Sequence, residues 1–274
     1  MQLAKHIAQG QLLYRQNDNT TDVNSGVLSV CENNYYRWLA FEDVVQSVMH
    51  KRLPHRLTLP HQTVMLLPLL FFRPKSIIEF GLGGGNFARF LKLLHSNIDF
   101  SSIEHHQSVI QNFHQYFNPQ QIDINIIHQD AVQWLATSQP NNYLHTEQDI
   151  DKHSVLGELD WLICDIYHQQ FSEPKKMNAL LESLMDKISS NSCLSINLPD
   201  VSDVEVELCL TLLHQLSQHH CIGYFHIPNY LNIVIQVYPQ HWNIEKALKN
   251  NKQSYLPKRL HLQWRKYWRE IKRL

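Results

Sequence analysis

Asp165 and His168 are the two residues whose types and places best suit chemistry on a bound molecule. Asp165 ends the apolar run 159–165, which has the composition of a buried strand. A carboxylate there can orient or deprotonate an amine, or offset the charge of a sulfonium; its alternative role is to cap the following loop. His168 has the imidazole pKa that suits a general base, but the chain has 18 histidines, so a single one carries less weight.

A cluster of glycines supplies the second signal. Half of the chain's eight glycines fall within five residues: Gly81, Gly83, Gly84 and Gly85. The strand-like run 76–80 precedes them and the helix-like run 86–95 follows them. A strand, a glycine turn and a helix N-terminus together form the nucleotide-binding corner of an α/β sheet, because glycine lets the backbone approach a ligand closely.

Acidic residues around this turn favour an adenosyl group attached to sulfur over a dinucleotide. A dinucleotide fingerprint needs a third glycine where Asn86 stands, whereas an acid followed by alternate glycines, starting at Glu79, is typical of S-adenosylmethionine enzymes. Glu104 ends the next expected strand, where an acid reaches ribose hydroxyls. Asp130 follows the third strand and is expected to accept a hydrogen bond from the adenine amino group. It also precedes a helical run, so it suits a helix N-cap.

Alternating strand and helix patterns predict the fold that positions these residues. Strands are expected at 76–80, 100–104, 122–127, 159–165, 193–198, 221–227 and 232–237. Helices are expected between them, at 86–95, 107–117, 131–137, 176–188 and 204–218. This alternation predicts an α/β fold with a mostly parallel sheet, and the short last connection predicts an antiparallel final pair. The expected fold is the seven-strand, class I S-adenosylmethionine methyltransferase-like (Rossmann-like) sheet.

The segments that flank this sheet differ from it in character, so we predict three domains. Residues 1–58 contain short β-like runs separated by turn residues, which indicates a small N-terminal antiparallel β-hairpin domain. Residues 59–240 form the methyltransferase-like domain. Residues 241–274 form a basic C-terminal helical tail with apolar residues at helical spacing. The polar segment 138–157 is interpreted as an exposed insertion.

Composition and charge indicate where the protein is located and which partners it could bind. The formal net charge is −1, and no apolar run is long enough for a secretory signal or a membrane span, so we expect a cytoplasmic protein. The five cysteines contain no CxxC pair, which indicates free thiols. The cysteines and histidines do not have the clustered spacing that is typical of a metal site. The tail 247–274 carries nine Lys/Arg and one acid. We interpret it as docked on its own domain or on a second subunit, with nucleic acid or an acidic membrane surface as the alternative partner.

The order of the motifs resembles the spermidine synthases, the polyamine aminopropyltransferases, over about residues 27–237. The family's glycine turn resembles Gly81-Leu82-Gly83-Gly84-Gly85, its second-strand acid resembles Glu104, and its Asp-Ala pair resembles Asp130-Ala131. Its catalytic D-x-x-D segment resembles Asp165-Ile166-Tyr167-His168, and its Y-H-E segment resembles Pro60-His61-Gln62. Its strand ending in V-V-Q resembles the segment that ends at Gln46.

The resemblance implies roles for these residues. Asp165 would anchor or deprotonate the acceptor amine, with His168 as a modified partner. His61 and Tyr167 would contact a putrescine-like amine. The co-substrate would be S-adenosylmethionine or its decarboxylated form, held by Gly81, Gly83, Gly84, Gly85, Glu104, Asp130, Ala131 and Gln46. The family's β domain often mediates dimers, which implies a homodimer.

Departures from the family pattern fall mainly in the amine half of the site. The turn aspartate that holds the aminopropyl ammonium in the family is Gly84 here, and the second aspartate of D-x-x-D is His168. The tyrosine before His61 is Pro60, and the family's gate loop is not recognisable after His168. Three functions therefore stay open: an aminopropyltransferase, a methyltransferase-type enzyme that uses S-adenosylmethionine, and a non-catalytic, adenosyl-binding regulatory protein.

Overall fold

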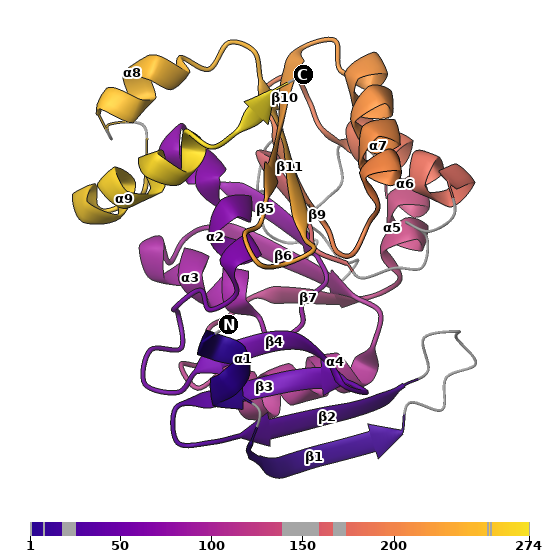
Figure 1. The fold of residues 1–274 in the computed structure, drawn as a ribbon, viewed down its shortest axis with the longest axis vertical. Coiled ribbons are helices and arrows are strands. Elements are labelled where there is room, and N and C mark those ends of the chain that lie inside the picture. Colours follow the sequence, from indigo (N-terminus) through magenta and orange to yellow (C-terminus); the bar gives the residue numbers. More distant parts are fainter. Residues whose placement is uncertain are drawn as a thin grey trace, which may run out of the picture.

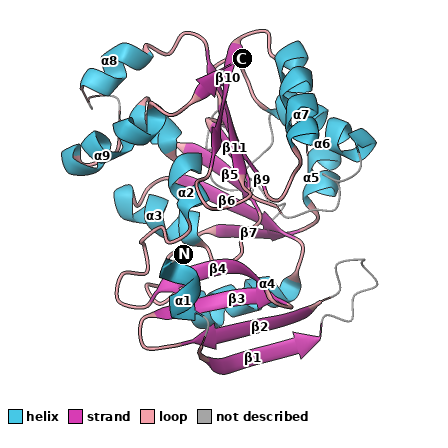
Figure 2. Ribbon diagram, in the orientation of Figure 1, coloured by secondary structure: helices cyan, strands magenta, loops and turns pink. Residues whose placement is uncertain are grey.

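The chain folds around two sheets. The computed structural model describes residues 2–7, 9–17, 26–138, 159–166, 174–250, 252 and 254–273. These residues contain a four-stranded sheet near the N-terminus and an eight-stranded sheet built by the rest of the chain (Figure 1). Helices cover both faces of the larger sheet, and the smaller sheet lies beyond its β7 edge (Figure 2).

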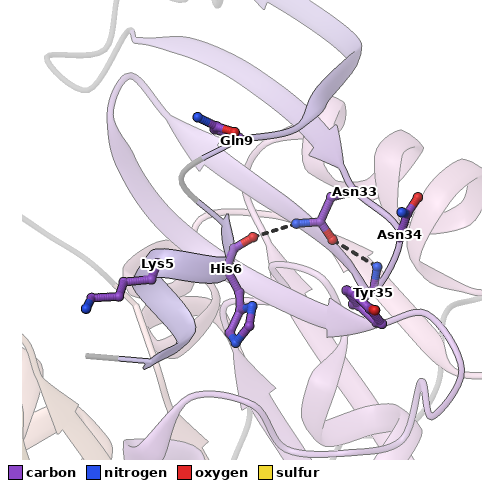
Figure 3. A pocket seen from close by; sticks show the side chains of 6 residues that line it. All are labelled: Lys5, His6, Gln9, Asn33, Asn34 and Tyr35. Atoms are coloured by element: carbon purple, nitrogen blue, oxygen red, sulfur yellow. Dashed lines mark hydrogen bonds between the residues drawn. The ribbon is translucent and has the colours of Figure 1, made fainter.

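The smaller sheet is an antiparallel meander. Its strands follow in chain order: β1 (Gln11–Asn17), β2 (Val27–Glu32), β3 (Tyr36–Phe41) and β4 (Val44–His50). Helix α1 (Gln2–Ile7) precedes them, and a shallow hollow lies between α1 and the β2–β3 turn (Figure 3). Leu28, Val30 and Leu39 are fully buried on one face, in a cluster that includes Phe113 and Phe117 of the larger domain. The small sheet therefore shares a hydrophobic core with the domain that follows it.

The larger sheet has the strand order β12-β10-β11-β9-β8-β5-β6-β7. Five strands run parallel: β5 (Ser76–Phe80), β6 (Asp99–Glu104), β7 (Asn125–His128), β8 (Trp161–Cys164) and β9 (Cys193–Leu198). Strand β11 (Ile233–Pro239) is antiparallel to both β9 and β10 (His220–His226). The predicted fold class is confirmed, including the antiparallel final pair.

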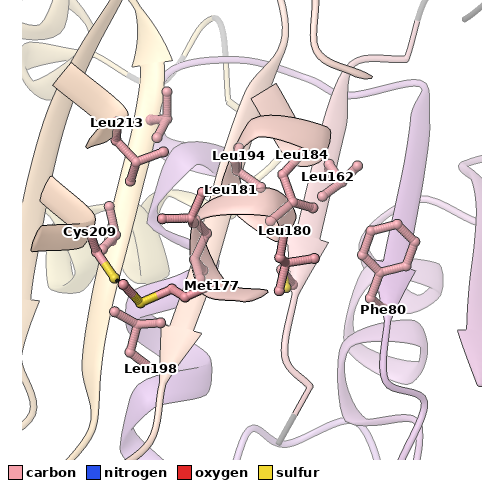
Figure 4. Packing of buried hydrophobic residues seen from close by; sticks show 14 of the residues in the cluster. Phe80, Leu162, Met177, Leu180, Leu181, Leu184, Leu194, Leu198, Cys209 and Leu213 are labelled. Atoms are coloured by element: carbon pink, nitrogen blue, oxygen red, sulfur yellow. Dashed lines mark hydrogen bonds between the residues drawn. The ribbon is translucent and has the colours of Figure 1, made fainter. Parts of the chain in front are cut away.

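One face of the larger sheet is covered by α5 (Ala131–Thr137), α6 (Pro174–Lys187) and α7 (Asp203–Leu216). Helix α6 forms as an amphipathic helix because Met177, Leu180, Leu181 and Leu184 recur at a spacing of three and four residues. These four side chains are buried against Leu162 and Leu194 of the sheet and against Cys209 of α7 (Figure 4).

The opposite face carries α2 (Pro60–Met65), α3 (Asn86–Leu94) and the C-terminal segment. That segment contains α8 (Ile244–Lys249), α9 (Lys258–Trp268) and the two-residue strand β12 (Lys272–Arg273). Trp264 stacks on Phe90 at 5.6 Å between ring centroids, and Trp268 meets Phe71 at 4.4 Å. The tail is thus docked on its own domain, and it ends in a strand on β10 that helical periodicity did not predict.

Several elements begin or end elsewhere than expected. Strand β7 starts at Asn125 because the side chain of Asn118 bonds both the N–H and the C=O of Ile122, which holds the preceding residues in a loop. Helix α4 (Gln107–Asn112) continues as a π-helical turn, Phe113–Phe117. Helix α2 ends at Met65, and a 3₁₀ turn, Leu67–Leu70, follows it. Residues 139–158 lie outside the described residues.

Candidate functional site

The predicted glycine turn joins β5 to α3. Gly81 has a φ of 92°, and a Cβ atom there would lie 2.5 Å from the carbonyl oxygen of Asp165. Only glycine therefore lets the end of β5 pass so close to the end of β8. The Gly81 N–H donates to the carbonyl of Ile103 at 3.0 Å, and the Asp165 N–H donates to Phe80 at 3.0 Å. The turn is thus fixed to the strands on both of its sides.

Glu104 joins the glycine turn to the end of β6. One carboxylate oxygen, Oε2, accepts the N–H of Leu82 at 3.1 Å, and the other, Oε1, accepts the N–H of His106 at 2.9 Å. Each oxygen has a second acceptor position, and Nδ1 of His105 lies 3.6 Å from Oε1. The contact between Glu104 and the hydroxyl groups of a ribose stays a prediction.

Asp130 lies beside Glu104, because β7 is the neighbour of β6 and the Gln129 N–H donates to the Glu104 carbonyl at 3.1 Å. Its Oδ1 accepts the N–H of Gln133 at 2.9 Å and caps α5, which is the alternative role expected from sequence. Ala131 is buried in the first turn of that helix. The contact between Asp130 and an adenine group stays a prediction.

Gly84 faces a side chain of the small sheet. A Cβ atom at Gly84 would lie 2.5 Å from the Oγ atom of Ser47 on β4. Gln46 precedes Ser47 and is the extra residue of a bulge in the β3–β4 pairing, where Leu39 pairs with Ser47 and Ala40 pairs with Val45. The bulge brings β4 against the glycine turn. Ser47 is therefore a site residue that sequence reasoning missed.

The other turn glycines complete the opening of α3. Gly83 and Gly85 have positive φ angles of 49° and 66°. Gly85 is the N-cap of α3 and supplies no side-chain cap. The first backbone N–H groups of an α-helix have no partners within the helix, so those of α3 lack both a helical and a side-chain acceptor at the turn.

Arg89 of α3 supports the turn from beneath and is buried. Its guanidinium donates to the carbonyl oxygen of Gly84, to that of Phe117 at 2.7 Å and to that of Pro54 at 2.7 Å. Burial lowers the pKa of Arg89 to about 9, and the nearby Glu79 opposes that effect. Arg89 thus joins the turn to two other segments. An arginine inside the apolar stretch 87–91 was the sequence signal for it.

Glu79, the acid that begins the glycine pattern, lies in the interior of the sheet. It pairs in register with Ser102 on β6 and is 1% exposed. Burial raises the pKa of Glu79 well above its usual range, and the charges of Asp165 and Glu104 raise it further. Burial beneath the turn therefore disfavours the charged form of Glu79.

Asp165 follows β8 directly and is held by an amide. Its Oδ1 accepts a hydrogen bond from Nδ2 of Asn197, at the end of β9, at 2.8 Å. The Oδ1 of Asn197 accepts in turn from Nδ2 of Asn232 at 3.0 Å, which fixes the orientation of the Asn197 amide. The Asp165 side chain is 22% exposed, so it is oriented by the protein and still open to a bound molecule.

His61 lies opposite the second oxygen of that carboxylate. Its Nε2 is 3.8 Å from Oδ2 of Asp165, which is longer than a hydrogen bond. Gln62 caps the start of α2, because its Oε1 accepts the N–H groups of Thr58 and Leu59. At the other end of α2, the Met65 carbonyl accepts from Ser195 at 3.0 Å and from Gln236 at 3.2 Å. The sheet thus fixes the helix that presents His61.

The structure brings together most of the predicted site residues. The four glycines, Glu104, Asp130 and Asp165 follow or end neighbouring strands. His61 faces Asp165 from helix α2, and Gln46 lies on the adjoining bulge. Tyr167 and His168 lie outside the described residues. The described part of the chain contains no group of three or more side chains suited to a metal ion. The hollow lined by Lys5, His6 and Asn33 (Figure 3) belongs to the small sheet and contains no predicted site residue.

The arrangement of the strands matches known structures. A spermidine synthase bound to the transition-state analogue AdoDATO aligns over 92% of this chain and 84% of its own, at 12% identity and a TM-score of 0.61. The chain has a spermidine synthase fold. A probable spermidine synthase from Corynebacterium glutamicum aligns over 84% of this chain and 80% of its own, at 14% identity and a TM-score of 0.60.

The same fold extends to methyltransferases. Human methyltransferase-like protein 13 in complex with SAH aligns over 76% of this chain and 90% of its own, at 14% identity and a TM-score of 0.53. No protein-family model matches the sequence, and none of the curated proteins matches it. The low identities show the shared fold alone. No helix in the described residues is long and apolar enough to cross a membrane.

Proposed function

We propose that this chain is a transferase that moves an aminopropyl group from a decarboxylated S-adenosylmethionine-type donor to an amine. The observation that carries the proposal is the placement of Asp165, which Asn197 holds at the end of β8 beside Gly81. A solved spermidine synthase in complex with the transition-state analogue AdoDATO has this fold, which supports a donor of that kind here. Gly81, Gly83, Gly85 and Glu104 would hold the adenosyl part, with Asp130, Ala131 and Gln46 around it.

In the proposed reaction the acceptor amine donates a hydrogen bond to Asp165. This hydrogen bond orients the lone pair of the amine nitrogen toward the donor. The nitrogen attacks the carbon next to the donor's sulfonium, and the carbon–sulfur bond breaks. The electron pair of that bond stays on sulfur, so a neutral thioether nucleoside leaves. Asp165 accepts the proton that the amine loses. His61 would contact the amine, as would Tyr167 and His168 if they lie where the resemblance implies.

Methyl transfer from S-adenosylmethionine is the second candidate, and one contact favours it. Ser47 occupies the space beside Gly84, so a neutral hydroxyl stands where the resemblance expects a carboxylate for the donor's ammonium. Loss of that carboxylate removes repulsion against a donor that keeps its own carboxylate group. Calorimetric titration with the two donors separates the candidates, since a clear preference for the decarboxylated donor counts against methyl transfer.

The deciding experiment is product analysis by mass spectrometry. The wild-type protein is incubated with decarboxylated S-adenosylmethionine and putrescine, and both methylthioadenosine and spermidine are expected above a protein-free background. Thermal-shift titration with methylthioadenosine runs in parallel. A result in which methylthioadenosine raises the melting temperature while neither donor yields an alkylated amine would identify a non-catalytic adenosyl-binding protein. A homodimer through the small sheet is proposed on the resemblance alone.

A further inference from the structure

Two exposed helix faces carry opposite charge. Helix α7 exposes Asp203, Val204, Glu207, Leu208 and Thr211. Helix α9 exposes Lys258, Arg259, Leu262, Lys266 and Tyr267. The α7 residues follow the pattern i, i+1, i+4, i+5 and i+8, and the α9 residues follow the pattern i, i+1, i+4, i+8 and i+9, so each set lies on one face of its helix. We call them the acidic α7 face and the basic α9 face.

Both faces also expose apolar surface. Val204 and Leu208 are 67% and 47% exposed, and Leu262 and Tyr267 are 41% and 40% exposed. The opposite sides of the two helices are buried: Val206, Cys209, Leu210 and Leu213 in α7, and His261, Trp264 and Trp268 in α9. Each helix is therefore held rigidly by its own domain, with its charged and apolar side turned outward.

The two faces lie on opposite flanks of the larger sheet, with α7 at the right and α9 at the left of the view in Figure 1. One molecule cannot bring them together. A second copy can, because its α7 offers carboxylates and apolar side chains to the lysine, arginine and apolar side chains of α9. We propose that the basic α9 face of one copy packs on the acidic α7 face of another copy.

This contact joins two different surfaces, so each copy that joins still offers one free face. The association should therefore grow beyond a dimer as the protein concentration rises. A single pair of helices buries less area than a standard stable interface, and exposed ion pairs are weak. We expect a weak association that salt suppresses, since the Debye length falls from about 30 Å at about 0.01 M to about 10 Å at about 0.1 M ionic strength.

Charge reversal with complementation tests the contact by sedimentation velocity. Arg259→Glu/Lys266→Glu makes the α9 face acidic, and Glu207→Lys/Thr211→Lys makes the α7 face basic without altering the first turn of α7. Each variant alone should fail to form the salt-sensitive larger species. An equimolar mixture of the two should form them again, because each unlike pair of faces is restored. Lys5→Glu and Asp43→Lys, on exposed residues of the small sheet region, serve as matched controls.

The mixture distinguishes the proposal from its alternatives. A homodimer through the small sheet would persist in every variant and at high salt, so the proposal concerns only growth beyond it. Wild-type mass that does not change with concentration at low salt would overturn the proposal. It would also be overturned if the mixed variants stayed apart, or if the wild type bound a labelled RNA through α9 without self-association.

Discussion

The imidazole of His61 faces the carboxylate of Asp165 at 3.8 Å, although α2 and β8 are far apart in the chain. The two side chains meet because α2 packs on the sheet through Ser195 and Gln236, next to the strand end where Asp165 lies. Asn197 holds the other oxygen of Asp165. One oxygen of the carboxylate is thus held by Asn197. The other faces His61, which the resemblance predicts to contact the substrate amine.

Asp165→Asn should lower kcat by about 100- to 10,000-fold, because an amide accepts no proton from the attacking amine. Donor affinity, measured by calorimetry, should change little. Asp43→Asn, on an exposed turn, is the matched control and should retain full activity. Full turnover in the Asp165→Asn protein would rule out a role for this carboxylate in the reaction.

Asn197→Leu should lower kcat by about 10- to 100-fold, since a hydrogen bond to a charged group contributes about 1.5–3 kcal/mol. The donor's binding constant should be unchanged, because Asn197 contacts Asp165 and not the glycine turn. Asn232→Ala should have a smaller effect, as it only orients the Asn197 amide. Steady-state kinetics with saturating donor measures both, and equal losses in the two variants would contradict the described chain of contacts.

Gly84→Asp should destabilise the protein, because its Cβ would lie 2.5 Å from Oγ of Ser47. The φ angle of Gly84 is not in the positive range, so the obstacle is the neighbouring side chain and not the backbone. Ser47→Gly/Gly84→Asp should recover much of the lost stability and shift donor preference toward decarboxylated S-adenosylmethionine. Thermal melts of Ser47→Gly, of Gly84→Asp and of the double variant measure how strongly the two substitutions affect each other's stability. Additive melting shifts would show that the two residues do not compete for space.

Glu79→Gln should stabilise the fold at neutral pH. The pKa of Glu79 is raised in the folded state, so its contribution is complete below the unfolded value and is lost as pH rises toward the folded value. Between those two pKa values, the free energy of unfolding of the wild type should fall relative to that of the variant by up to about 1.4 kcal/mol per pH unit. Urea unfolding from about pH 4 to 8 measures this difference. Parallel curves for the two proteins would mean that Glu79 is ionised in the folded state.

Arg89→Met should lower the free energy of unfolding by about 2–5 kcal/mol, because buried carbonyl oxygens lose their donor. The carbonyls concerned belong to Pro54, Gly84 and Phe117. The variant should also weaken donor binding, since Gly84 belongs to the glycine turn. Arg56→Met, at an exposed position of the preceding connector, should do neither. Denaturant unfolding and calorimetry report the two effects separately.

Local patterns predicted most of the fold. The run 193–198 reads as a buried strand because its apolar residues form one short stretch, and the structure has β9 at those residues. Strand β12 has two residues, which is too short for any periodicity, so it could be found only from its pairing with β10. Residues 113–117 look helical in sequence, and in the structure they form a π-helical turn whose Phe113 and Phe117 side chains lie against the glycine turn.

The site was predicted where it depends on neighbours in the chain and missed where it depends on distant contacts. Glu104 lies at the end of β6 as predicted, because it ends an apolar run at the expected distance from the glycines, and its role toward a ligand stays a prediction. Asn197 and Ser47 reach the site from β9 and from the small sheet, and nothing in their own segments indicates it. Asp130 caps helix α5 in the structure, as the sequence indicated, whereas its predicted contact with adenine stays a prediction.

The short pairing of β12 with β10 has a consequence for handling the protein. Strand β10 is the last long strand on this side of the sheet, and the two-residue edge strand β12 places the positive charges of Lys272 and Arg273 beside Tyr224 and Gly223. Proteolytic trimming that removed these residues would leave a seven-residue strand open to pairing with strands of other molecules, which is a common start of aggregation. A purification tag is therefore better placed away from this segment.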